Sequence, residues 1–293
     1  MSENWRTVII NECCDLRFRE GLVLVCGEEY REIAICEIKT IYINSRLVNI
    51  TSYLISELIS NNVSVIFSDE KKNPVGEIVG FYGNHQSSGR LKAQIKWSDE
   101  GKAAMWKEII RAKIFNSANL LNLVNKSDSR LYEYAENVMD DDITNREGVA
   151  AKIYFNKLFG DNFVRNQSDL INSALNYGYA ILRSMVVREI VIKGYNPALG
   201  IKHSSKFNNN NLTYDLMEPF RPFVDKVVYN TIISNGILNN EFKNLLIGFQ
   251  YEDIKYNGKV MECGTAITLY VDDVLKNIGN RNFKIKKMEF INA

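Results

Sequence analysis

One stretch of this 293-residue sequence, residues 195–225, combines side chains of types that bind divalent cations: the imidazole of His203 and the carboxylates of Asp215 and Glu218, to which Glu147 upstream adds another carboxylate. Neutral imidazole and carboxylate oxygens form a mixed nitrogen and oxygen ligand set, which suits Mg²⁺ or Mn²⁺. A cation held in this way can bind a scissile phosphate, neutralise the charge of an in-line displacement and orient the attacking oxygen. The residue types therefore indicate a metal-dependent enzyme that processes DNA, if the fold brings them together.

Glu147 also has a purely structural interpretation. Thr144-x-x-Glu147 has the spacing of a capping box, in which the threonine and the glutamate satisfy free backbone donors at the start of a helix. Asn145 and Arg146 lie between them, and the positive end of a helix is equally a place for a phosphate or a metal ion. Both interpretations stay open for Glu147, and Arg146 becomes a candidate phosphate contact.

His203 is one of only two histidines in the chain, and it follows the turn sequence Gly200-Ile201-Lys202. A loop histidine that bonds to the backbone is the structural alternative. The asparagine-rich loop after it and the neighbouring Lys202 and Lys206 are unusual surroundings for a core residue. They favour a ligand role for the imidazole, and the two lysines are candidate phosphate contacts.

Asp215 and Glu218 are three positions apart, so they share one face if their segment is helical. They could instead be capping carboxylates at a helix start, where Pro219 would fit within the first turn. Arg221 lies three residues beyond Glu218 on the same face. It could form an exposed salt bridge worth about 0–1 kcal/mol, or it could hold a phosphate through two parallel hydrogen bonds.

The overall charge limits how nucleic acid could be held. The chain has 36 lysines and arginines against 35 aspartates and glutamates, which gives a formal net charge of +1. DNA would therefore need a local basic surface, or a surface assembled from several chains. The sequence contains no GxSxG, Walker, GxGxxG or HExxH motif, so no competing chemistry is indicated.

Compartment signals point to the cytoplasm. Five cysteines without a CxxC pair indicate thiols in a reducing compartment. The N-terminus shows no apolar signal-peptide core. The longest apolar run, residues 177–192, is interrupted by Arg183, Arg188 and Glu189, which argues against a membrane span. We expect a cytoplasmic protein without membrane association.

The hydrophobic periodicity changes along the chain and predicts an α+β protein. Residues 1–82 should form a small β-rich domain for packing or dimerisation, residues 83–89 a linker, and residues 90–293 a larger all-α catalytic domain. Strands are expected over residues 7–10, 15–19, 21–26, 32–37, 40–44, 63–67 and 75–81. Helices are expected over residues 51–60, 99–124, 129–139, 144–160, 168–193, 214–234, 240–246 and 265–278, and a hairpin over 251–261. Thr51 and Ser98 are the expected caps of the first two helices.

The chain resembles the CRISPR-associated integrase family of spacer acquisition (the Cas-one family) and is most similar to its type II form. The resemblance spans nearly the whole chain. Its most specific segment is Asp-Leu-Met-Glu-Pro-Phe-Arg-Pro-Phe-Val-Asp at 215–225, behind the Gly-x-x-His at 200–203. The other matching segments are residues 5–8, 81–85, 145–148, 151–155 and 176–179.

The resemblance implies that Glu147, His203 and Glu218 bind a catalytic Mg²⁺ or Mn²⁺, with Asp215 as a supporting acidic residue. It implies an endonuclease and integrase, in which the 3′-hydroxyl of a captured DNA fragment attacks a phosphodiester at the edge of the CRISPR repeat. It also implies a homodimer through the β-rich domain. Two such dimers would be bridged by a dimer of the small Cas-two protein, with room for other type II adaptation proteins.

A function of another class is also compatible with the sequence: a non-catalytic DNA-binding scaffold whose carboxylates are helix caps and salt bridges. A scaffold would bind DNA equally well with a chelator present and after Glu147→Ala. Helix capping predicts that Glu147→Gln stays functional, because glutamine can take the same place in a capping box. Metal ligation predicts a folded but inactive variant.

Overall fold

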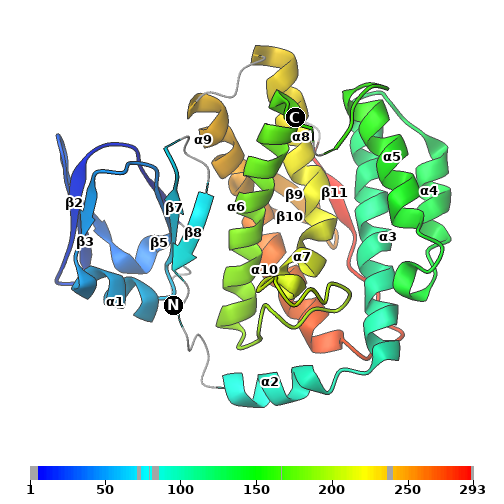
Figure 1. Ribbon diagram of the computed structural model, residues 1–293, viewed down its shortest axis with the longest axis horizontal. Coiled ribbons are helices and arrows are strands. Elements are labelled where there is room, and N and C mark those ends of the chain that lie inside the picture. Colours follow the sequence, from blue (N-terminus) through cyan, green and yellow to red (C-terminus); the bar gives the residue numbers. More distant parts are fainter. Residues whose placement is uncertain are drawn as a thin grey trace. The chain divides into compact units, whose positions relative to one another are not determined.

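The computed structural model describes residues 6–70, 74–78, 80, 86–165, 167–235 and 240–291. The chain divides into two compact units, Met1–Ser87 and Ser88–Ala293 (Figure 1). Residues 5, 79 and 81–85 lie outside the described residues; they belong to the last strand expected in the first domain, to the expected linker and to two segments of the family resemblance. Helix α2 begins at Ser87, so the last three residues of the expected linker are helical.

The first unit contains two four-stranded sheets. One has the strand order β1-β5-β7-β8, in which the first three strands are parallel and β8 is antiparallel to β7. The other has the order β4-β3-β2-β6, an antiparallel meander to which β6 is added parallel to β2. The strands are β1 Arg6–Ile10, β2 Cys14–Arg19, β3 Leu22–Cys26, β4 Tyr30–Ala34, β5 Ile38–Ile43, β6 Val48–Ile50, β7 Ser64–Ser68 and β8 Pro74–Ile78.

Apolar side chains from both sheets share one core. Leu16 of β2 and Val23 of β3 pack in the same buried cluster as Ile38 of β5. Helix α1, Ser52–Ser60, adds Leu54 and Leu58, which are i and i+4 and therefore lie on one helical face. The period-two alternation of the strands is what turns their apolar side chains toward this core.

The expected elements of the first unit are largely confirmed. The Thr51 side chain accepts a hydrogen bond from the Leu54 backbone N–H at 3.2 Å, as predicted for the cap of α1. The strand expected over 32–37 is wrong at its end, because the strand stops at Ala34 and residues 35–37 form the 3₁₀ turn η1. Strand β6 was not expected, since three residues are too few to show an alternation.

Two long helices, α3 and α6, organise the second unit (Figure 1). Helix α3 packs against α4, α5, α8 and strand β11, and α6 packs against α7, α8, α9 and α10. Ser98 accepts from the Gly101 N–H at 3.1 Å, which confirms it as the cap of α3. Among the described residues, no helix is long and apolar enough to cross a membrane. The helices are α2 Ser87–Ile95, α3 Asp99–Leu123, α4 Ser129–Glu136, α5 Arg146–Phe159, α6 Leu170–Ile192, α7 Asn211–Met217, α8 Arg221–Asn235, α9 Asn240–Gly248 and α10 Cys263–Asn277, with 3₁₀ turns η2 Asp140–Asp142, η3 Glu218–Phe220 and η4 Phe249–Tyr251.

We expected the second unit to be all-α, and this prediction is wrong, because the unit contains a small antiparallel sheet. Strands β9, Asp253–Tyr256, and β10, Lys259–Glu262, form the predicted hairpin, whose turn residues have the positive φ angles that Asn and Gly tolerate. Strand β11, Met288–Phe290, completes the order β10-β9-β11. A three-residue strand near the end of the chain forms only through this tertiary pairing, so local periodicity could not reveal it. The fold remains a mixed α+β fold with a β-rich first unit and a mainly helical second unit.

Helices α6 and α8 approach each other closely at Gly178. A Cβ atom at this position would overlap Cγ1 of Val224, so the valine side chain or the helices would have to move. We expect Gly178→Ala to lower the free energy of unfolding by about 1–3 kcal/mol, measured by urea denaturation. Gly248→Ala is the matched control, because no atom of the described residues lies within 4 Å of the place that its Cβ would take. Equal stability of the two variants would contradict the close packing.

Candidate metal centre

Glu147 stands in the first turn of α5, but the helix is capped by another residue than expected. The N-cap is Asn145, whose side-chain oxygen accepts from the Gly148 N–H at 3.3 Å. Asn145 has a φ of 51°, a left-handed conformation that asparagine tolerates better than most residues. The prediction of a capping box formed by Thr144 and Glu147 is therefore wrong, because the helix begins one position later than that pattern requires.

The free backbone donors at this helix start are satisfied by Asp142 instead. Its carboxylate accepts from the N–H groups of Arg146 at 2.8 Å and Glu147 at 3.0 Å. The Glu147 carboxylate is thus released from helix capping. Its Oε1 accepts a hydrogen bond from Nζ of Lys113 at 2.6 Å.

Glu218 lies where α7 gives way to α8. The single helix expected over 214–234 is interrupted here by the turn η3, which carries Pro219 directly after Glu218. The Glu218 side chain is only 5% exposed, and Nη2 of Arg221 lies 2.9 Å from its Oε1. Its Oε2 lies 2.6 Å from Nζ of Lys113, yet this oxygen has no aligned hydrogen bond among the described residues. Oε2 is therefore an anionic atom that lies against an ammonium group without a well-aligned donor in the described part of the chain.

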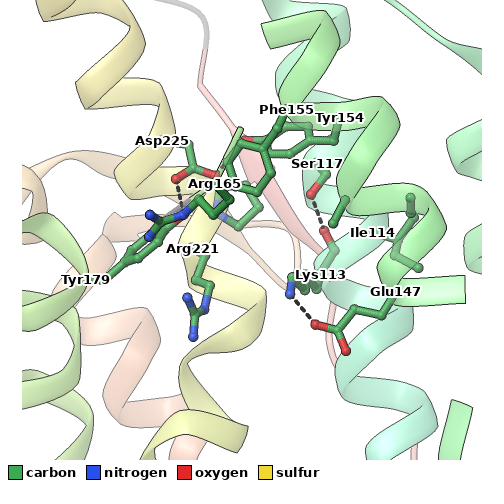
Figure 2. A pocket seen from close by; sticks show the side chains of 13 residues that line it. Lys113, Ile114, Ser117, Glu147, Tyr154, Phe155, Arg165, Tyr179, Arg221 and Asp225 are labelled. Carbon is green, nitrogen blue, oxygen red and sulfur yellow. Dashed lines mark hydrogen bonds and ion pairs between the residues drawn. The ribbon is translucent and has the colours of Figure 1, made fainter. Parts of the chain in front are cut away.

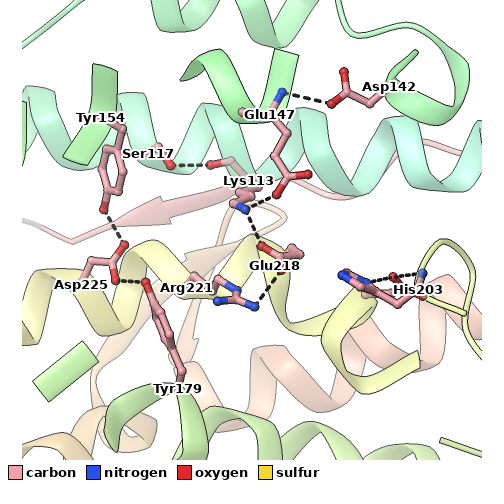
Figure 3. Close-up of polar contacts among 12 residues, drawn as sticks. Lys113, Ser117, Asp142, Glu147, Tyr154, Tyr179, His203, Glu218, Arg221 and Asp225 are labelled. Atoms are coloured by element: carbon pink, nitrogen blue, oxygen red, sulfur yellow. Dashed lines mark hydrogen bonds and ion pairs between the residues drawn. The ribbon is translucent and has the colours of Figure 1, made fainter. Parts of the chain in front are cut away.

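Lys113 of α3 joins the two carboxylates (Figure 3). Burial opposes its charged form, but Glu218 and Glu147 outweigh burial and raise the pKa of the ammonium. Burial likewise opposes ionisation of Glu218, and Arg221 and Lys113 outweigh it and lower the pKa of that carboxyl. Both shifts favour the charged forms, so the site holds a charged lysine against a charged Glu218 at neutral pH.

Sequence reasoning missed Lys113, although a signal was present. Trp106, Ile110 and Ser117 are buried residues of α3, and Lys113 falls on the same stripe at helical spacing. A lysine on the buried stripe of a helix needs an anionic partner, because burying a lone ammonium is strongly unfavourable. That position could have been identified as a member of a charged site.

Asp215 shapes the loop that carries His203. Its fully buried carboxylate accepts from the backbone N–H groups of Ile201 at 2.6 Å, Lys202 at 3.0 Å and His203 at 3.1 Å. Gly200 allows the tight turn, since a Cβ there would overlap the His203 carbonyl oxygen. The loop therefore wraps around one carboxylate that holds three of its backbone donors.

Asp215 also orients the imidazole. Its Oδ1 lies 2.6 Å from Nδ1 of His203, and this hydrogen bond raises the pKa of the imidazole against the opposing effect of partial burial. The ring meets Trp106 edge-on with centroids 5.9 Å apart. When Nδ1 donates to a carboxylate, the lone pair of Nε2 is left for a ligand, an arrangement that is usual for metal-binding histidines. Asp215 thus serves the histidine and the loop that carries it.

The structure brings the predicted ligands into one electrostatic neighbourhood. Glu147 and Glu218 meet at one ammonium, and both carboxylates contribute to the raised pKa of His203. Among the described residues, no three side chains of His, Cys, Asp or Glu already stand in the geometry of a metal site. The donor chemistry nevertheless fits a divalent cation, because two carboxylates converge on a positive charge and Glu218 Oε2 lacks an aligned donor in the described part of the chain.

A cavity of about 130 Å³ adjoins Lys113 and Glu147 (Figure 2). On its far wall, the buried Asp225 carboxylate accepts from the hydroxyls of Tyr154 at 2.7 Å and Tyr179 at 2.6 Å. The guanidinium of Arg221 lies over the Tyr179 ring, 4.7 Å from its centroid. This network holds Arg221, which in turn holds Glu218.

Asp225 should make stability depend on pH in the acidic range. Burial raises the pKa of this carboxyl to about 6, so between about pH 4 and 6 the folded protein binds a proton that the unfolded chain releases. The protonated Asp225 carboxyl therefore contributes to the free energy of unfolding at low pH, and this contribution is lost as the pH rises to 6. Relative to Asp225→Asn, the wild type should lose roughly 2–3 kcal/mol over this window and nothing more above it, as measured by urea denaturation. A constant difference between pH 4 and 7 would contradict the raised pKa.

The four candidate phosphate contacts lie in different surroundings. The Arg146 guanidinium packs over the Tyr134 ring at 5.3 Å, and Lys202 pairs with Asp141 at 2.7 Å. Lys206 is exposed in the loop after His203. Arg221 is mostly buried and pairs with Glu218, so in this structure its role is to hold that carboxylate.

The fold is thus a β-rich unit followed by a mainly helical unit that carries a carboxylate and imidazole centre. The chain belongs to the family described as CRISPR associated protein Cas1, whose profile matches residues 8–250. It is 32% identical over 291 residues to the CRISPR-associated endonuclease Cas1 of Neisseria meningitidis serogroup C (strain 8013), covering 97% of this chain and 95% of the relative. The family resemblance is confirmed.

Two solved structures show the same fold. A casposase bound to integration product aligns with a TM-score of 0.78 at 21% identity, over 96% of this chain and 92% of that chain. A Cas6-RT-Cas1–Cas2 complex aligns with a TM-score of 0.72 at 16% identity, over 96% of this chain and 36% of that chain. At these identities, the likeness describes the fold rather than the site.

Proposed function

We propose that this protein is a metal-dependent DNA integrase and endonuclease of CRISPR adaptation, of the type II kind. Membership of the Cas1 family supports this function, and a relative of nearly equal length is named an endonuclease. A structural relative is a casposase bound to integration product. The observation that carries the proposal is the convergence of Glu147 and Glu218 on one positive charge, beside an imidazole that Asp215 orients.

In this proposal Glu147, Glu218 and Nε2 of His203 hold Mg²⁺ or Mn²⁺. When bound, the cation supplies positive charge to the scissile phosphate and to the leaving oxygen. Asp215 keeps the imidazole in the tautomer that presents Nε2, and Arg221 fixes the orientation of Glu218 through Oε1.

The reaction is a transesterification. The 3′-hydroxyl of the captured fragment attacks a phosphorus at the edge of the repeat, a new phosphorus–oxygen bond forms, and the bond to the 3′-oxygen of the repeat breaks. The attacking hydroxyl loses its proton to solvent, and the leaving 3′-oxygen takes up a proton to become a hydroxyl. Arg146, Lys202 and Lys206 are the candidate contacts to DNA phosphates, and Arg221 is a weaker candidate because Glu218 already occupies it. Water in place of the hydroxyl would give nuclease activity as a side reaction.

In the proposed working assembly, the β-rich unit forms a homodimer and two such homodimers are bridged by a dimer of Cas2, with captured DNA and the repeat bound across several chains. A structural relative stands in a complex with Cas2, and a formal net charge of +1 fits a DNA surface shared among chains. Other type II adaptation proteins can join this assembly. All five cysteines are thiols, in keeping with a role in the cytoplasm.

A strand-transfer assay tests this function. The protein and its Cas2 partner are mixed with a short labelled duplex and a supercoiled plasmid that carries a repeat, in Mn²⁺ or Mg²⁺. We expect label to move onto the plasmid and the transfer to disappear with a chelator and with His203→Ala. Lys276→Ala, which removes an exposed pair with Asp272 on α10, is the control. DNA binding without any transfer in either metal would reject the integrase.

One observation favours the second candidate, a non-catalytic DNA-binding scaffold. Glu147, Glu218 and Asp215 already have cationic or N–H partners within the chain, as purely structural carboxylates would. A scaffold requires that a chelator and His203→Ala leave DNA binding unchanged and that no strand transfer occurs. The same assay therefore separates the two candidates.

A further inference from the structure

We propose that Lys113 is an internal counter-ion that holds Glu147 and Glu218 together in the metal-free protein and gives up its position when the divalent cation binds. The inference rests on the proposed function, because it concerns the same two carboxylates. It assigns a role to a residue that the ligand set does not include.

The geometry places one positive charge where two negative charges meet. Nζ of Lys113 lies 2.6 Å from an oxygen of Glu147 and 2.6 Å from an oxygen of Glu218. Because both contacts share Nζ, Oε1 of Glu147 and Oε2 of Glu218 must lie close to each other. Without a cation between them, partly buried carboxylates at such a separation repel each other. A lysine ammonium is a compact point charge, which suits this bridging position.

Glu218 uses its two oxygens differently. Oε1 pairs with Arg221 at 2.9 Å, so the carboxylate keeps its orientation whatever happens at the other oxygen. Oε2 faces Lys113 and has no aligned hydrogen bond from any described residue. Loss of the lysine contact therefore frees one oxygen of a carboxylate that remains fixed, which is what an incoming cation requires.

The ammonium and a divalent cation cannot occupy this position together. Carboxylate oxygens bind Mg²⁺ at about 2.0–2.1 Å, so a cation shared by Glu147 and Glu218 would overlap the place of Nζ. The adjoining cavity of about 130 Å³ is lined by Lys113 itself and gives the displaced side chain room, in surroundings that hold the acidic Glu147 and Asp225 as well as the guanidinium groups of Arg165 and Arg221. Binding of the cation is thus an exchange of one positive charge for another.

A titration with Mn²⁺ tests this exchange. Free Mn²⁺ is followed by its electron paramagnetic resonance signal in wild type, Lys113→Met and Lys113→Gln, and the melting temperature is measured with and without Mn²⁺. Removal of the competing ammonium should tighten Mn²⁺ binding by about tenfold or more, equivalent to about 1.4 kcal/mol. The metal-free variants should melt lower than wild type, and saturating Mn²⁺ should raise their melting temperature by more than it raises that of wild type.

Lys107→Met is the matched control, because Lys107 lies on the same helix and pairs with Asp140 rather than with the two glutamates. It should leave Mn²⁺ affinity unchanged. If Lys113→Met does not fold, Lys113→Gln decides the question, since glutamine can still donate to one carboxylate. Unchanged or weaker Mn²⁺ binding in the folded variants would overturn the inference, because the lysine would then support the cation instead of competing with it.

A direct view of the side chain separates displacement from a general charge effect. In NMR spectra of protein labelled with ¹⁵N-lysine, the Nζ signal of Lys113 is the one that is missing from the Lys113→Met variant. This signal should be visible without metal and should shift or vanish when Mg²⁺ is added. A signal that stays unchanged at saturating Mg²⁺ would overturn displacement. If Glu218→Gln binds Mn²⁺ as tightly as the wild type does, the proposed function fails. If Glu218→Gln binds Mn²⁺ more weakly but Lys113→Met does not bind it more tightly, only this inference is rejected.

Discussion

Replacing Glu147 with glutamine is expected to abolish strand transfer while leaving the protein folded. The helix start does not depend on this side chain, because Asn145 caps α5 and Asp142 accepts from the two first N–H groups. Substitutions of groups that only orient metal ligands already lower activity about 10–100-fold. Loss of a ligand oxygen should exceed that range, as measured by the amount of labelled duplex joined to the plasmid, with circular dichroism to check folding.

Two capping variants provide the controls for this prediction. Asn145→Ala should lower the free energy of unfolding by about 1 kcal/mol, since it removes the acceptor for the Gly148 N–H. Thr144→Ala should change neither stability nor strand transfer. A Glu147→Gln variant that keeps full strand-transfer activity would reject metal ligation by this residue and would restore a structural role.

Replacing Asp215 with asparagine is expected to disrupt the His203 loop and the imidazole together. One amide oxygen cannot accept from three backbone N–H groups and a ring N–H, and its NH₂ group would face donors. Each buried donor left without an acceptor costs about 1–3 kcal/mol. We expect a clear loss of stability in urea denaturation and a loss of strand transfer of about 10–100-fold.

The same variant should change the titration of the imidazole. In the wild type, the hydrogen bond that Nδ1 of His203 donates to Asp215 raises the pKa of the imidazole, so Asp215→Asn should lower this pKa. The chain has two histidines, and His203→Ala identifies the relevant signal in proton NMR titrations. Asp272→Asn, a change on the surface of α10, should leave the titration unaltered. An unchanged His203 pKa in Asp215→Asn would contradict the orienting role of this carboxylate.

Local signals in the sequence predicted the elements that depend on local physics. Thr51 and Ser98 cap the helices they were expected to cap, because a hydroxyl before an amphipathic run satisfies a nearby N–H. The hairpin around 257–258 followed from its turn residues. Strand β11 and the correct cap of α5 depend on pairing and on a left-handed residue, neither of which periodicity reveals.

The candidate site was predicted in its residue types but not in its connections. Glu147, His203 and Glu218 were selected as ligands, and the structure adds the residues that hold them. Lys113 lies more than thirty positions before Glu147 and on another helix, so no spacing rule links the two. Arg221 was predicted as a phosphate contact, whereas its closest partner is Glu218. Such pairings arise from packing of α3 against α5 and η3, which only the folded chain specifies.

The measurement that tests the central claim most directly is the location of Mn²⁺ by anomalous diffraction from crystals soaked in Mn²⁺. In the proposed function, Glu147, His203 and Glu218 hold a single divalent cation in the helical unit. We predict one anomalous peak within bonding distance of an oxygen of each glutamate and of Nε2 of His203. A peak elsewhere, or no peak at this position under conditions in which Mn²⁺ supports strand transfer, would contradict it.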